Sequence, residues 1–194
     1  MRTVQKNDVC DKFLAAISKI ENYVDKCDEV FSDNKLFLSY SYENAVIMLY
    51  REFENFILEI LIYCLNHDHS NFERTYNIKL GKHINYDVCQ YLITNGGYFD
   101  FKGRSNLSKV LNSLIGKEHN AAKTFKKTEY KDVLEQLFAL RNYAAHNSSQ
   151  SKKAALKAYN LQKIGSAGSC LKQQNRLDNM IKDIKALTIE IKGL

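Results

Sequence analysis

The sequence predicts an all-α protein: a helical bundle of about five to seven helices, with an up-and-down core and a C-terminal helix. Three observations support this fold class. The 194 residues include no proline, the residue that most strongly interrupts helices. Apolar residues recur at steps of three and four along several long segments, and no segment shows the sustained alternation of a half-buried strand. A hydrophobic content of 45% with 26% charged residues is ordinary for a globular protein with a buried core.

The first two helices are expected at residues 8–31 and 41–66, where apolar residues follow the helical period. Residues 32–34 (SDN) interrupt the pattern, and residues 66–71 (NHDHSN) end the second helix. His67, Asp68 and His69 in that turn could bind a metal. Because they lie on one loop with no third partner in view, a solvated turn is the more ordinary interpretation.

The middle of the chain is less regular. Residues 86–93 (YDVCQYLI) predict a short helix that the following TNGGY segment stops, and residues 98–105 (YFDFKGRS) predict a turn or a short extended piece. Ser105 is expected to cap the start of the next helix, with Gly116 ending it. Thr128 is expected to cap the helix that follows, which runs to residue 146.

Residues 152–159 (KKAALKAY) predict another short helix, and a final helix is expected at 169–192 after a turn of small residues. We therefore predict a single domain over 1–194. It would consist of an N-terminal helix (1–34), a core (35–150) and basic C-terminal helices (151–194).

The net charge of +6 resides in the last quarter of the chain. Residues 151–194 hold nine basic and three acidic residues, whereas residues 1–150 sum to zero. Such asymmetry indicates a surface that attracts polyanions. The longest apolar stretch, residues 56–65, is half the length of a membrane span, and no apolar run follows the first basic residue, so we expect no membrane segment, no secretory signal and a cytoplasmic location. The five cysteines show no paired spacing, which is typical of small buried thiols in a reducing compartment.

A cluster of chemically capable residues closes the predicted helix that ends near residue 146: Arg141, Asn142 and His146. On an ideal helix, Asn142 and His146 lie within about 40° of each other, whereas Arg141 and His146 diverge by about 140°. Arginine and histidine can therefore act together only if the guanidinium reaches round, the helix loosens, or two copies of the chain meet across a two-fold axis.

These residue types suit cleavage of an RNA phosphodiester without a metal. Histidine can take the proton from a 2′-hydroxyl or give one to the leaving 5′-oxygen. Arginine can bind the non-bridging oxygens as charge builds on phosphorus, and asparagine can orient either group. The alternative is structural: His146 would be a cation at a helix C-terminus, with Asn147 as a left-handed cap.

The segment LRNYAAHNSSQSKKAALKA resembles the signature of the HEPN superfamily of all-α domains, whose nucleases carry Arg, a polar residue and, a few residues later, His. REFENFILEIL upstream is similar to an aromatic-Glu-aromatic pattern of that superfamily, and SAGSCLKQQNRLDNMI resembles the tail of its defence-type bacterial members. The resemblance covers roughly residues 40–190, but only Arg-Asn-x-x-x-His is specific.

The resemblance implies catalytic Arg141, Asn142 and His146, no metal or cofactor, and a homodimer with a composite active site. It also implies an endoribonuclease that is the toxin or effector of a defence or toxin–antitoxin system, with an antitoxin or other regulatory protein as partner. One departure concerns members that have a Tyr two residues after the His and are controlled by its adenylylation. Here that position is Ser148.

Other residues have a functional and an ordinary interpretation. Glu54 could support the site or be the polar shoulder of an amphipathic helix. Three lysines could follow RNA phosphates or be a solvated helix face: Lys152, Lys153 and Lys157. Four tyrosines could stack bases but are more often core: Tyr40, Tyr42, Tyr50 and Tyr63. The alternative functions are a non-catalytic RNA- or nucleotide-binding module and a helical dimerisation partner.

Overall fold

The computed structural model describes residues 4–194. In that range the chain forms ten α-helices and two short 3₁₀ helices, and no strand. The all-α prediction is therefore confirmed. The predicted number of five to seven helices is wrong, because several short helices connect the long ones.

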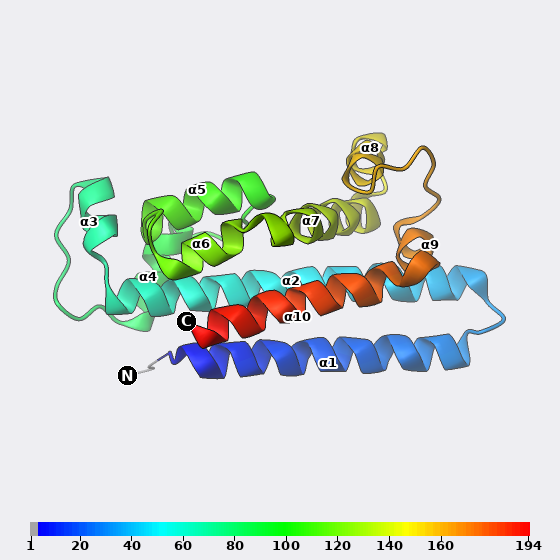
Figure 1. The fold of residues 1–194 in the computed structure, drawn as a ribbon, viewed down its shortest axis with the longest axis horizontal. Coiled ribbons are helices and arrows are strands. Elements are labelled where there is room, and N and C mark those ends of the chain that lie inside the picture. The colour runs from blue at the N-terminus through cyan, green and yellow to red at the C-terminus, as the bar shows by residue number, and fades with distance from the viewer. Residues whose placement is uncertain (1–3) are drawn as a thin grey trace.

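Three long helices lie along the long axis of the molecule (Figure 1). Helix α1 (Lys6–Val30) and helix α2 (Lys35–His67) form an antiparallel pair, and α10 (Arg176–Gly193) lies beside them near the C-terminus. Asn34 caps α2 because its side chain accepts a hydrogen bond from the Phe37 amide. Helix α2 thus begins six residues before the predicted start at residue 41.

The remaining helices cover one side of α2 (Figure 1). They are α3 (Ser70–Tyr76), α4 (Tyr86–Thr94), α5 (Arg104–Leu114), α6 (Asn120–Lys126), α7 (Lys131–His146), α8 (Ser149–Ala158) and α9 (Ala167–Lys172). Helices α3 and α6 have seven residues each and were not predicted. A helix of two turns is too short to show a periodic apolar pattern.

Three predicted boundaries are wrong. Ser105 lies inside α5, whose N-cap is Gly103, and Thr128 begins a 3₁₀ helix (Thr128–Tyr130) without capping it. The predicted helix 169–192 is broken between α9 and α10, where Gln174 and Asn175 adopt left-handed backbone angles with φ of 58° and 51°. Gly116 does end α5, and its positive φ of 88° suits glycine.

One hydrophobic core runs through the molecule and takes side chains from residues 1–34, 35–150 and 151–194 alike. Phe13 of α1 stacks on Phe56 of α2 with ring centroids 4.6 Å apart. All five cysteines are buried and unpaired, as their spacing predicted.

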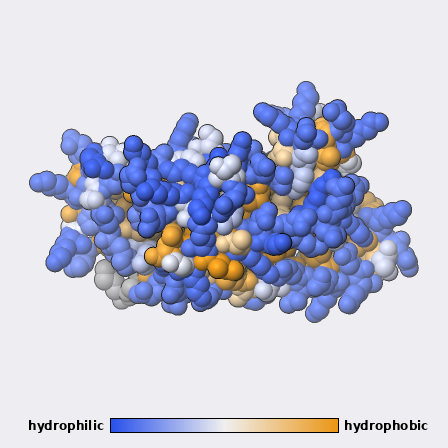
Figure 2. Space-filling view, in the orientation of Figure 1, coloured by the Kyte–Doolittle hydropathy of each residue, from blue (hydrophilic) through white to orange (hydrophobic). Residues whose placement is uncertain are grey.

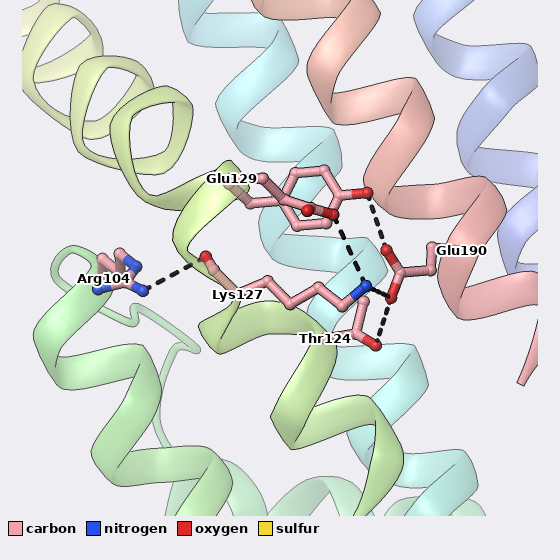
Figure 3. A network of polar contacts seen from close by, with 6 residues as sticks. Arg104, Thr124, Lys127, Glu129 and Glu190 are labelled. Atoms are coloured by element: carbon pink, nitrogen blue, oxygen red, sulfur yellow. Dashed lines mark hydrogen bonds and ion pairs between the residues drawn. The ribbon is translucent and has the colours of Figure 1, made fainter.

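A polar network fixes the start of α7 against the end of α10 (Figure 3). The Glu190 carboxylate accepts hydrogen bonds from Thr124 and Tyr130, each at 3.0 Å, and pairs with Lys127 at 2.8 Å. Burial acts to raise the pKa of Glu190, but these three donors together hold it below its ordinary value. The network thereby holds the N-terminal end of α7, the helix that carries the motif.

The face shown in Figure 2 is mostly hydrophilic, with hydrophobic side chains exposed along the seam between α10 and α1. Among residues 4–194, no helix combines the length and the apolar character that crossing a membrane requires.

Candidate active site at the end of α7

Helix α7 holds its C-terminal end in place through buried side chains and one long-range hydrogen bond. Its inner face buries Leu137, Leu140 and Tyr143, and the Tyr143 hydroxyl donates to the Gly165 carbonyl. The helix ends at His146, and Asn147 follows with φ of 43°. This left-handed residue is the cap that the structural alternative predicted.

Arg141 is fixed between two helices. Its guanidinium carbon lies 4.4 Å from the ring centroid of Tyr50 on α2, within the range of a cation–π interaction. Its Nη1 donates to the Oδ1 of neighbouring Asn142 at 2.8 Å. The sequence predicts Tyr50 only as a core or base-stacking tyrosine, because nothing local links it to position 141.

Arg141 and Asp100 both act on the carboxyl group of Glu54 on α2. Glu54 follows Tyr50 by one helical turn, and its Oε1 is buried without a hydrogen-bond partner among the described residues. Burial and the charge of Asp100 raise the pKa of Glu54 to about 7, while Arg141 and the Tyr50 hydroxyl act in the opposite direction. The charge of Arg141 thus acts on Glu54, and the supporting role of Glu54 stays a prediction.

His146 has a different environment. It is exposed, and among residues 4–194 its imidazole has no hydrogen-bond or ion-pair partner. Helix α7 includes His146, so of the three options given for bringing Arg141 and His146 together, loosening of the helix does not apply. Arg141 instead contacts Tyr50 and Asn142. A single chain thus anchors the arginine and leaves the histidine free.

The lysines of the C-terminal quarter include one group that pairs with acidic residues and a second group on α8 (Ser149–Ala158) that does not. On one side, α9 and α10 direct lysines to acidic groups of α1: Lys172 to Asp28, Lys185 to Glu21 and Lys192 to Asp11. These pairs neutralise three of the nine basic side chains of residues 151–194.

The second group lies on α8, immediately after the motif. Lys152, Lys153 and Lys157 are exposed, and none has an ion-pair partner in the described part of the chain. Ser148 and Ser151 form a capping box that starts α8 directly after the cap of α7. Three lysines without an ion pair therefore follow His146 in the chain, although Lys163 and Lys182 also lack one among the described residues.

A groove of about 620 Å³ lies between the start of α2 and the end of α7. Tyr40, Asn147 and Ser166 contribute to its lining. The tyrosine prediction divides accordingly: Tyr42 and Tyr50 are core residues, whereas the Tyr40 side chain is 53% exposed.

The His67–Asp68–His69 segment is the end of α2 and the turn that follows. His67 Nδ1 lies 2.8 Å from the Tyr63 carbonyl, and Asp68 accepts from the Ser70 amide at 2.9 Å. No group of three or more metal-binding side chains gathers anywhere in residues 4–194. The turn interpretation accounts for these contacts.

Comparisons with known proteins give no family for this chain: no family model, no curated protein and no solved structure matches it.

Proposed function

We propose that this protein is a metal-independent endoribonuclease of the HEPN type that acts on RNA as a homodimer. The observation that carries the proposal is the arrangement at the end of α7. An exposed, unpaired His146 lies one helical turn after Asn142 and directly before the free lysines of α8. An imidazole beside cationic side chains suits proton transfer at a polyanion.

In the proposed reaction the RNA 2′-oxygen attacks the adjacent phosphorus and the bond from phosphorus to the 5′-oxygen breaks. His146 accepts the 2′-hydroxyl proton or donates one to the leaving 5′-oxygen, and Arg141 stabilises the charge on the non-bridging oxygens. The products are a 2′,3′-cyclic phosphate and a 5′-hydroxyl end.

A homodimer accounts for the divergence of the two residues. The α7 geometry separates Arg141 from His146 in one chain, and a two-fold pairing of motif helices would gather both residue types around one cleft. The resemblance to HEPN domains further suggests a toxin or effector role, with an antitoxin or other regulatory protein as partner. Ser148 lies two positions after the histidine and is the N-cap of α8, so tyrosine adenylylation at this position has no acceptor.

The deciding experiment is gel-resolved cleavage of total RNA and tRNA by the purified protein in EDTA. His146→Ala should lower the rate by ~10²–10⁴-fold while RNA binding and the fold persist. His83→Ala is the matched control, because His83 is also exposed but lies outside α7. Equal cleavage by wild type and His146→Ala would refute the proposal.

The left-handed cap at Asn147 favours a second candidate, a non-catalytic RNA- or nucleotide-binding module or a dimerisation partner in which His146 only stabilises the helix end. A binding module would lose RNA affinity on Arg141→Ala and show no cleavage in any form. A purely structural role would lower thermal stability on either change without an RNA phenotype.

A further inference from the structure

The surroundings of Arg141 form a rigid platform. Tyr50 is only 1% exposed, and its ring is held by Phe101 and Phe138 at centroid distances of 5.2 Å and 6.2 Å. The guanidinium lies over this immobile ring at 4.4 Å. Stacking uses the flat face of a guanidinium and leaves the N–H groups at its edge free to donate.

The edge of the guanidinium is nearly unused. Of its five N–H donors, the described contacts engage one, to Asn142. The remaining edge can therefore receive an anion such as a phosphate oxygen.

The charges around the platform come from three elements. Glu54 of α2 lies one helical turn after Tyr50, and its Oε1 is buried without a hydrogen-bond partner among the described residues. Asp100 of the segment before α5 is the second acidic group and Arg141 of α7 is the cation, and both act on Glu54. When Glu54 is protonated, Arg141 and Asp100 balance. When Glu54 is ionised, the cluster carries a net negative charge and attracts the guanidinium more strongly towards α2.

We propose that Tyr50 and Glu54 are positioning residues for Arg141: the ring supports the face of the guanidinium, and the carboxyl group controls how strongly it is held against α2. The two side chains thereby set where the cationic edge of the motif lies. Any effect of Tyr50 and Glu54 on RNA cleavage rests on the proposed function, whereas their effect on the position of the guanidinium does not depend on it.

The test follows the arginine Nε–H signals by ¹⁵N-resolved NMR between about pH 6 and about pH 8, the interval that brackets the Glu54 titration. The chain has six arginines, so Arg141→Lys assigns the signal of interest. We expect this proton to lie upfield because of the Tyr50 ring current and to shift with pH. Tyr50→Phe should keep the upfield position, and Tyr50→Leu should lose it.

The role of the Glu54 carboxyl group is tested independently of the role of the Tyr50 ring. Glu54→Gln should abolish the pH-dependent shift of the Arg141 signal while leaving it upfield. Glu52→Gln is the matched control, since Glu52 pairs with Arg51 at 3.0 Å and should perturb that signal alone. An unchanged Arg141 signal in Tyr50→Leu, or an unchanged titration in Glu54→Gln, would overturn the proposal; these two variants cover the case in which one fails to fold.

Activity separates this inference from the proposed function. If the wild type cleaves RNA, Tyr50→Leu should reduce the rate by ~10²-fold and Tyr50→Phe should retain most of it. If the wild type cleaves nothing, the ribonuclease proposal fails, and the NMR result still decides the positioning roles.

Discussion

Replacing Glu54 by glutamine should stabilise the protein at alkaline pH and not at acidic pH. Burial raises the pKa of Glu54 from an ordinary 4.5 to about 7. A raised folded-state pKa means that the folded protein binds this proton more tightly than the unfolded chain does. The stabilising contribution is therefore complete below the unfolded value and is lost as pH rises through about 7. Glutamine cannot ionise and escapes this loss.

The magnitude follows from the same shift. A change of one in pKa corresponds to ~1.4 kcal/mol, so a rise from 4.5 to about 7 sets an upper limit of roughly 3 kcal/mol. Glu54 is only half-buried, and solvent screening reduces the expected effect to ~1–2 kcal/mol.

Urea unfolding followed by circular dichroism at about pH 5 and about pH 8 measures this effect. The free-energy difference between Glu54→Gln and wild type should increase by ~1–2 kcal/mol from the lower to the higher pH. Taking this difference cancels every other titrating group, and Glu52→Gln controls for loss of a carboxylate on the same helix. If both proteins lose stability equally over the interval, Glu54 does not titrate there and the electrostatic argument is wrong.

Three further outcomes test other parts of the structure. Asn147→Ala should cost ~1 kcal/mol in chemical unfolding and Asn147→Gly should cost less, because only the alanine is strained at positive φ; equal losses would argue against the left-handed cap. Glu190→Gln should lower the free energy of unfolding by ~1–2 kcal/mol at neutral pH, with the difference shrinking as acid protonates Glu190 through its lowered pKa; a difference that grows in acid would reverse the sign of this argument. RNA affinity should fall with salt along a logarithmic slope near −2 if three α8 lysines make the phosphate contacts, and Lys152→Ala should reduce that slope by ~0.7; an unchanged slope would place the contacts elsewhere.

The long helices were predictable because their apolar periodicity extends over many turns. The start of α2 was missed because Leu36, Phe37 and Tyr40 are exposed and do not follow the buried pattern. The break before α10 was missed for a different reason. Gln174 and Asn175 adopt left-handed angles there, and neither residue type interrupts a helix reliably enough to be read from sequence.

At the candidate site, sequence analysis identified the residues of α7 but not their surroundings. Helical spacing predicts that Arg141 and His146 diverge, and α7 is continuous through both residues. The contact between Arg141 and Tyr50 joins helices far apart in the chain and arises from packing, so no local pattern predicts it. The excess of basic residues in the last quarter follows directly from the composition. The sequence does not show that Lys172 and Lys185 pair with acidic residues of α1, because such pairing depends on which helices become neighbours.

The Arg141 guanidinium and the His146 imidazole differ in how many contacts within the chain fix their positions. Arg141 is supported by a buried ring and a hydrogen bond, so its place is fixed before any anion arrives. His146 is exposed and its imidazole is unpaired in the described structure, so no contact within residues 4–194 fixes its rotamer. Under the proposed function, the group that stabilises the transition-state charge is preorganised within each monomer, so no free energy is needed to orient it during the reaction. Proton transfer requires a defined imidazole position as well, and here only a bound RNA or a second copy of the chain can supply it.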